Sequence, residues 1–467
     1  MNHSPINIKY LLFLALVSAM GGFLFGYDWV VIGGAKPFYE LYFAIADIPT
    51  LQGWAMSSAL VGCVFGAGLS AVLADTWGRK NSLIFAAALY MISALGTGFS
   101  DGFTTFIVFR LIGGLGIGLA STISPMYIAE IAPAKYRGQL VAINQLTIVV
   151  GILAAQITNW GIAETIPTDF GPSELNASWN GQYGWRIMFW AELIPAGLFF
   201  FLMFLVPKSP RFLVKTGNEG TASKFLKKIG GREYAKNEIR SMKSSLKTNS
   251  RQKITASEIK DKKILSILGI GVVLAIFQQW CGINIIFNYA EEVFTAAGYS
   301  VGDMFFNIVI TGSVNLVFTF VAMMTVESWG RRKLMLFGAI GLAVVYVFLG
   351  AAYYFEFRGW PVLLLVFMAI GIYAMSLAPV TWVILSEIFP SNLRATGMSI
   401  ATFSLWLSSF VLTFTFPILN NLLGTYGTFW MYSGICVLGF IFIKKKLPET
   451  KGKSLEELEL CIKKQNP

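Results

Sequence analysis

Residues 75–80 read DTWGRK and residues 327–332 read ESWGRR, so an acid, Trp-Gly-Arg and a further base recur at the same spacing. A second pair, EIAP at 130–133 and EIFP at 387–390, is followed in each copy by an arginine four residues after the proline. The first pair is 252 residues apart and the second pair 257. Two motifs that recur in the same order at nearly the same offset indicate a duplicated unit.

Composition places this unit in a membrane. Of 467 residues, 55% are hydrophobic and only 13% are charged, with a mean hydropathy of +0.64. Thirty-nine Phe and thirteen Trp carry more apolar surface than one soluble core can hide, whereas a bilayer accepts it on the outside of helices. Four scattered cysteines and one histidine, His3, offer no ligand spacing, so we expect no metal site, redox centre, disulfide framework or cofactor.

Apolar runs of about 20 residues predict twelve membrane-spanning helices. They cover residues 9–32, 52–74, 82–99, 103–124, 138–160, 186–206, 264–297, 303–327, 334–354, 361–385, 396–420 and 425–443. No small-residue cleavage site follows the first run, which favours a retained helix over a signal peptide. We therefore expect an all-α integral membrane protein, and two parallel six-helix repeats around a midplane site are typical of secondary transporters.

The positive charges lie on one side of this arrangement. If the N-terminus is cytoplasmic, 32 of the 36 Lys and Arg fall in cytoplasmic segments. The opposite side keeps Lys36, Arg186 and Arg358, and Arg110 lies inside a span. The positive-inside rule then places both termini in the cytoplasm, in a multi-pass protein of the plasma membrane, here a bacterial inner membrane. The net charge of +11 is thus topological and does not indicate nucleic-acid binding.

The same asymmetry suggests the domain organisation. Residues 207–263 hold sixteen Lys and Arg, few aromatics and two stretches that could form amphipathic surface helices. We expect an N-terminal six-helix half at 1–206, a basic cytoplasmic linker at 207–263, a C-terminal half at 264–443 and a cytoplasmic tail at 444–467.

The repeated motifs put charges at the cytoplasmic ends of four spans. Such charges can bridge helix ends while the inner mouth is shut and must separate when it opens, so they predict a gate. A single loop of this kind would be explained better as a topology anchor, but two symmetric copies favour the gate. The predicted gate residues are Asp75, Arg79, Glu130, Arg137, Glu327, Arg331, Glu387 and Arg394.

Further motifs carry a resemblance over nearly the whole chain. GYD at 26–28, RLIGG at 110–114, PMYIAE at 125–130, QQ at 278–279 with GIN at 282–284, and PETKG at 448–452 resemble the sugar porter family of the major facilitator superfamily. The resemblance implies the major facilitator fold and transport of a sugar. It is specific for the family and weak on which sugar is carried.

Asp28 and Arg110 are an acid and a cation inside spans, where an unpaired charge is costly. At about 1.5 Å per residue they lie about 6 and about 10 Å from the outer face, so they can meet. Pairing keeps Asp28 ionised, and loss of Arg110 makes it take up a proton. The resemblance also implies proton binding, because the matching acid is the protonation site of proton-coupled sugar porters. A static ion pair is the alternative.

Glu192 is a second acid inside a span. By resemblance it matches an acid of the family, which favours a part in a proton relay. A buried, hydrogen-bonded carboxyl that tunes helix packing explains it equally well.

A sugar site needs amides that donate and accept hydrogen bonds, and an aromatic face for the C–H side of the ring. Gln279 and Asn284 would point about 140° apart on an unbroken helix, but Gly282 permits a break that lets both face one cavity. The resemblance implies sugar contacts for Gln145, Gln278, Gln279, Asn284, Asn315, Trp382 and Trp406. A lone amide such as Asn315 is explained as well by bonding between helices.

Three residues depart from the family pattern. Lys208 stands where the family usually has Glu, which affects the cytoplasmic charges. Asn288 replaces the first tyrosine of a common pair, and Leu405 occupies a position where xylose and glucose porters usually present Gln or Asn. The last two alter the pocket, so xylose is not carried over as the substrate.

Glycines at 113–118 and at 62 and 66 superficially resemble a phosphate loop. No strand precedes them and no Lys-Ser/Thr follows, so they predict close helix packing instead.

We therefore predict a secondary active transporter that imports a monosaccharide, meaning a pentose, hexose or related polyol, by proton symport through alternating access. Its partners would be the sugar, the proton and membrane lipid, and it would function as a monomer. A passive uniporter is the nearest alternative, disfavoured by Asp28 opposite Arg110. A sugar sensor would carry a longer tail than the 24 residues of 444–467. A membrane enzyme is disfavoured because no nucleophile, base and orienting group converge.

Overall fold

The computed structural model describes residues 6–133, 135–167, 170–249, 262–389 and 394–449, and within these ranges it contains helices and no strand. The helices are α1 (Ile8–Tyr42), α2 (Pro49–Thr76), α3 (Arg79–Gly98), α4 (Phe103–Ile131), α5 (Arg137–Ile162), α6 (Pro172–Ala177), the π-helix η1 (Asn180–Gly184), α7 (Trp185–Ala191), α8 (Leu193–Leu205), α9 (Pro210–Lys215), α10 (Glu219–Asn249), α12 (Lys262–Trp280), α13 (Ile283–Asn288), α14 (Ala290–Ala296), α15 (Val301–Trp329), α16 (Arg331–Tyr354), α17 (Trp360–Met375), α18 (Leu377–Ile388) and α19 (Arg394–Lys446).

Eleven stretches of the described chain are long and apolar enough to cross a membrane. The last of them, Thr396–Lys446, has 51 residues, which is enough for two crossings. Gly424 inside it has non-helical torsions (φ 69°, ψ 169°) and divides it into two spans. The twelve predicted transmembrane helices are therefore present.

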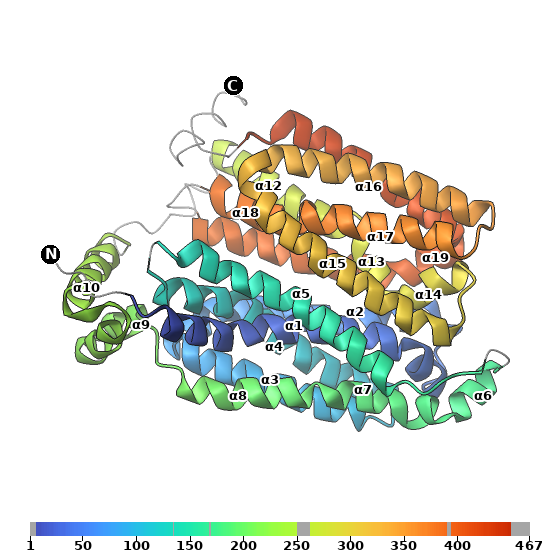
Figure 1. Ribbon diagram of the computed structural model, residues 1–467, viewed down its shortest axis with the longest axis horizontal. Helices are drawn as coiled ribbons and strands as arrows, with labels where there is room; N and C mark the ends of the chain where they lie inside the picture. Colours follow the sequence, from blue (N-terminus) through green and yellow to red (C-terminus); the bar gives the residue numbers. More distant parts are fainter. Residues whose placement is uncertain (1–5, 134, 168–169, 250–261, 390–393, 450–467) are drawn as a thin grey trace.

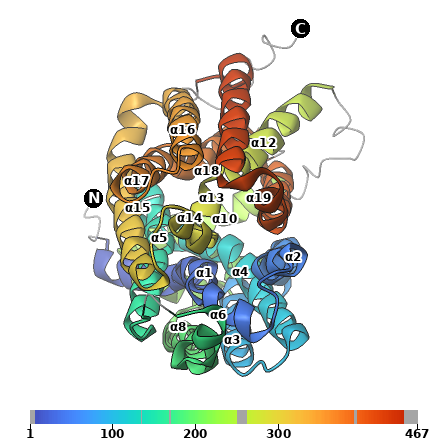
Figure 2. The same cartoon turned by 90° about the vertical axis from the view of Figure 1, so that its right-hand side faces the viewer.

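The helices form two bundles that lie side by side (Figure 1). One contains α1 to α8 and the other α12 to α19, and Figure 2 views both from one end. We call the contact zone between them the inter-bundle seam; α2 packs on α19 there, and α5 packs on α15. Helices α9 and α10 lie at one end of the first bundle, which we call the linker end, and the opposite end is the far end (Figure 1).

The duplicated motif adopts the same backbone in both copies. Gly78, between α2 and α3, has φ 83° and ψ 157°, and Gly330, between α15 and α16, has φ 89° and ψ 154°. Glycine adopts a positive φ at little cost, which explains why both motifs place it at this turn. The turn joins consecutive membrane helices in each bundle.

The glycines of α2 and α4 pack closely, as predicted. A Cβ on Gly114 would lie 1.8 Å from the carbonyl oxygen of Ala59, and one on Gly118 would lie 2.3 Å from that of Cys63. The two helices therefore touch along their backbones. This contact holds Arg110, earlier on α4, at the middle of the first bundle.

The first span differs from its prediction. It was expected to end at residue 32, but α1 continues to Tyr42 with Pro37 inside it. Lys36 is therefore a buried helical residue, with 2% of its surface exposed, and not a loop charge.

The linker contains helices at both predicted stretches. Helix α10 runs through them with non-helical torsions at Gly231 (φ 83°, ψ −175°). Phe225 and Ile229 of its first part are buried, and the Phe225 ring lies 6.2 Å from that of Tyr10 on α1. The rest of the linker, at 250–261, and most of the predicted tail lie outside the described residues.

Candidate functional site

Asp28 of α1 and Arg110 of α4 meet in the middle of the first bundle. Arg110 Nη1 donates a hydrogen bond to Asp28 Oδ1, and each side chain is 2% exposed. Asp28 Oδ2 and Arg110 Nε have no hydrogen-bond partner among the described residues. The expected distance of about 6 Å from Asp28 to the outer end of its span is too short for the helix observed, because α1 runs on for another fourteen residues after Asp28.

Glu192, at the junction of α7 and α8, belongs to the same cluster. It is 1% exposed and interacts electrostatically with both Asp28 and Arg110. Its Oε1 and the hydroxyl of buried Tyr90 have no partner in the described part of the chain. Two buried carboxyl groups thus lie near one guanidinium, but among the described residues the ion pair of Arg110 is with Asp28, so the charge of Glu192 is less fully compensated.

The second bundle provides a chain of amides. The predicted break occurs at Gly282, which adopts left-handed torsions (φ 88°, ψ −11°) between α12 and α13. Asn284 Nδ2 donates to Gln279 Oε1 and Gln279 Nε2 donates to Gln278 Oε1, both at 2.5 Å. Gln278 Nε2 in turn donates to the Tyr373 hydroxyl at 2.8 Å. The break therefore brings together the two amides that an intact helix would separate.

An aromatic group faces the seam from both bundles. The Trp406 ring of α19 lies 5.5 Å from that of Phe25 and 6.2 Å from that of Trp29, both on α1. Trp406 is 3% exposed and its indole N–H has no partner among the residues described. Leu405 beside it is also buried, and Trp382 of α18 is half-buried.

The remaining residues predicted to contact the sugar lie apart from the amide chain. Asn288, at the end of α13, is 4% exposed with no described partner for its Oδ1. Asn315 lies buried on α15, and Gln145 is half-buried on α5. They are placed on three helices that border the seam, and among the described residues no hydrogen bond joins them to the amide chain.

Predicted gate residues of the first bundle form ion pairs at the linker end. Arg79 Nη2 lies 2.8 Å from Glu130 Oε1, and Arg79 Nη1 lies 3.3 Å from Asp75 Oδ1. Glu130 also accepts a hydrogen bond from Ser209. Arg137 is exposed, and among the described residues the ion pair of Glu130 is with Arg79 and not with Arg137. These pairs join α2, α3 and α4.

The second bundle repeats part of this arrangement. Arg331 Nη2 lies 3.2 Å from Glu387 Oε1, which joins α16 to α18. Glu449 accepts hydrogen bonds from the backbone N–H groups of Arg331 and Arg332, at 3.0 and 3.2 Å. The side chains of Glu327 and Arg394 lie outside the described residues. The pairs of Arg79 with Asp75 and Glu130, and of Arg331 with Glu387, each join helices of one bundle.

Sequence reasoning missed Tyr373, Phe25, Trp29 and Lys36. Phe25 and Trp29 had a readable signal, because residues four apart share a helix face and both flank Asp28. Tyr373 had none, since a partner 95 residues away from Gln278 is not visible in a pattern. Lys36 was counted as a loop charge because α1 was expected to end before it.

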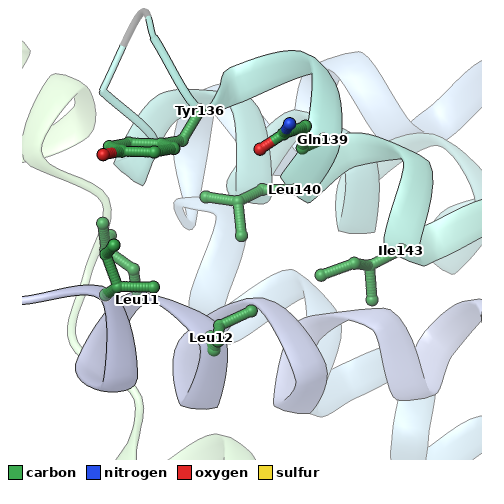
Figure 3. A pocket seen from close by; sticks show the side chains of 7 residues that line it. Leu11, Leu12, Tyr136, Gln139, Leu140 and Ile143 are labelled. Carbon is green, nitrogen blue, oxygen red and sulfur yellow. The ribbon is translucent and has the colours of Figure 1, made fainter.

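A small hollow lies elsewhere, at the linker end between α1 and α5 (Figure 3). It has a volume of about 110 Å³ and is lined by Ile8, Leu11, Leu12, Tyr136, Gln139, Leu140 and Ile143. These residues belong to the first bundle and are mostly apolar. The hollow is therefore separate from the amide chain and offers few groups for a sugar.

Comparison with known proteins agrees with this arrangement. A model of the family described as sugar (and other) transporter matches residues 14–461. The D-xylose-proton symporter of Escherichia coli K12 is 38% identical, covering 98% of this chain and 96% of its own. The arabinose-proton symporter of Bacillus subtilis is 35% identical, with 97% and 95% covered. A partially occluded inward-open structure of the E. coli xylose transporter superposes with a TM-score of 0.84 at 36% identity, covering 96% and 100% of the two chains.

Proposed function

Since the chain belongs to the sugar (and other) transporter family, we propose that it imports a monosaccharide together with a proton by alternating access. The linker end faces the cytoplasm, so both termini are cytoplasmic, and the membrane is the inner membrane of a bacterium. The protein works as a monomer, and nucleic acid is not among its partners. Symporters of xylose and of arabinose among its relatives support proton coupling and leave the sugar open.

The buried pair of Asp28 and Arg110 is the observation that carries this proposal. Asp28 has one carboxylate oxygen on Arg110 and one without a described partner. When Arg110 moves away, an isolated carboxylate in this dry site is costly, and binding a proton neutralises it. Glu192, close to both groups, passes the proton onward. A passive uniporter has no need of such a group.

The sugar binds in the inter-bundle seam. The amide chain of α12 and α13 supplies donors and acceptors for hydroxyl groups, and Trp406 supplies an aromatic face. Gln145, Asn288, Asn315 and Trp382 border the same region from other helices. One proton that falls through 100 mV releases ~2.3 kcal/mol, which supports roughly fifty-fold accumulation of a neutral sugar.

The cytoplasmic mouth closes where the charged helix ends meet. Arg79 with Asp75 and Glu130, and Arg331 with Glu387, fix these ends within each bundle. Glu327, Arg137 and Arg394 act in the same gate. Because the ion pairs fix the positions of the helix ends within each bundle, the two bundles can pack against each other when the cytoplasmic mouth closes.

The test is uptake by proteoliposomes of labelled pentoses, hexoses and inositol, with and without an imposed pH gradient. We expect one sugar to accumulate only with the gradient, and Asp28→Asn to abolish accumulation while it spares binding. Asp303→Asn, the same change at an exposed acid on α15, is the control and should transport normally. If Asp28→Asn still accumulates sugar, Asp28 is not the proton site. If the pH gradient does not change uptake by the wild type, the protein is a uniporter. Binding without any transport would establish a sensor.

A further inference from the structure

Lys36 lies at the far end of the seam and contacts three carboxylates. Its Nζ is 3.0 Å from Glu40 Oε2, 3.0 Å from Glu291 Oε2 and 2.9 Å from Glu292 Oε1. The lysine side chain is 3% exposed and Glu40 is 5% exposed, while the other two glutamates are 23% and 21% exposed. The cluster is therefore mostly buried and places three acidic side chains around one lysine.

Two of these three ion pairs cross between the bundles. Lys36 and Glu40 belong to α1, whereas Glu291 and Glu292 begin α14, which lies against α1 in the end view (Figure 2). The bundles are close at this level, since a Cβ on Gly33 would lie 3.0 Å from the carbonyl oxygen of Phe287. We call this end of the seam, formed by 33–42 of α1 and by α14, the outer mouth.

Opening of the outer mouth has to separate Lys36 from its partners on α14. A buried ammonium without a partner is strongly destabilising. Glu40 prevents that, because it lies one turn further along the same helix and moves with the lysine. Gln52 of α2, also in the first bundle, donates a hydrogen bond of 3.1 Å to the same Glu40 oxygen. Lys36 thus keeps one fixed partner while it exchanges the other two for water.

We propose that Lys36 latches the outer mouth through Glu291 and Glu292, with Glu40 as the partner that retains it when the mouth opens. The latch sets the balance between outward-open and inward-open states, and it rests on the proposed alternating-access function. The α14 carboxylates and Glu40 have opposite effects on the opening of the outer mouth. Loss of the α14 carboxylates favours opening, whereas loss of Glu40 makes opening harder because Lys36 would then be left unpaired.

The experiment measures the width of the outer mouth directly. Spin labels at Asp47→Cys and Glu356→Cys, both exposed connections at the far end of the two bundles, report their separation by pulsed electron resonance. The protein is the full chain in nanodiscs with Cys461→Ser, because the other three cysteines are buried. No sugar or pH gradient is applied, so failure of the latch and failure of symport are distinguishable.

In this background, Glu291→Gln with Glu292→Gln should raise the ratio of outward-open to closed molecules about tenfold. Glu40→Gln, a matched removal of one carboxylate from the same lysine, should leave that ratio unchanged or lower it. A Lys36→Glu, Glu292→Lys exchange restores an ion pair between α1 and α14, so its ratio of outward-open to closed molecules should be closer to that of wild type than the ratio of the double glutamine variant. If the double variant does not fold, Glu291→Gln alone should give a smaller rise of the same sign. Equal effects of Glu40→Gln and the α14 variants, or no effect of either, would overturn the latch.

Discussion

Asn284 donates a hydrogen bond of 2.5 Å to Gln279, five residues before it, across the left-handed turn at Gly282. The bond exists only because the helix is broken there. It also occupies the amide groups that a sugar would use, since Gln279 donates to Gln278 at the same time. In the proposed site, a sugar hydroxyl would therefore replace bonds within a preformed chain of amides, and we expect little reordering on binding.

Gln279→Ala should weaken sugar binding by about five-fold to about 150-fold. The change removes both the acceptor for Asn284 and the donor to Gln278, and an unmatched polar group in a buried site costs ~1–3 kcal/mol. Calorimetry or scintillation proximity on purified protein measures the affinity. Gln139→Ala, at an exposed amide of α5, is the control and should bind normally. If Gln279→Ala binds the sugar with near-normal affinity, Gln279 is not part of the sugar site.

The sequence predicted the break at Gly282 because a glycine between two amides is a local signal. The end of α1 was missed for a related reason. Gly33, Gly34 and Pro37 are residues that commonly end a helix, and a charge at Lys36 reads as the start of a loop. Glu40, one turn beyond Lys36, is a partner that the i,i+4 spacing could have revealed, whereas Glu291, 255 residues away, is not visible in any pattern within one helix.

The pairing of Asp28 with Arg110 was predictable, since they are the one acid and the one cation expected deep in the first four spans. The partners of the gate residues were less so. The repeated motifs indicated the gate residues but not which acid each arginine contacts. Arg79 reaches Glu130 because the packing of α3 on α4 brings the two motifs together. Arg137, beyond the end of α4 at Ile131, is exposed.

Gly53→Ala should shift the resting population toward the outward-open state. A Cβ at this position of α2 would lie 2.3 Å from the carbonyl oxygen of Phe414 on α19, so the seam could not close there without a backbone shift. Thiol labelling of a cysteine in the outer mouth measures the change, and we expect its rate to rise several-fold. Gly68→Ala, on the same helix with no atom within 4 Å of its Cβ, is the control. Equal labelling of both variants would contradict close contact at this seam.

Arg79→Ala together with Arg331→Ala should shift the population toward the inward-open state. The helix ends that these arginines hold become loose, and loose ends match less well across the closed cytoplasmic mouth. Accessibility of a cysteine on the cytoplasmic path measures the shift. Lys228→Ala with Lys236→Ala, which removes the same charge from exposed positions of α10, should have no effect. Unchanged accessibility in the double arginine variant would rule out the gate.

Leu405→Gln should move substrate preference toward xylose or glucose. Leu405 is 3% exposed beside Trp406, and its isobutyl group can neither donate to nor accept from a hydroxyl. A hydroxyl pressed against it without another partner loses ~1–3 kcal/mol, so the preferred sugar presents a missing or inverted hydroxyl, a C–H face or a methyl group there. We expect Asn288 of α13, whose Oδ1 has no partner among the described residues, to supply the displaced hydrogen bond.

The glutamine restores a hydrogen bond to that hydroxyl, and a gain of ~1.4 kcal/mol changes the preference ratio about tenfold. Competition between labelled native sugar and unlabelled xylose or glucose measures this ratio. Leu405→Met, which keeps the volume and the apolar character, separates the effect of the amide from that of altered packing. If wild type already prefers xylose or glucose and Leu405→Gln leaves the ratio where Leu405→Met does, then Leu405 only fills space beside Trp406 and the specificity lies with the amides of the broken helix.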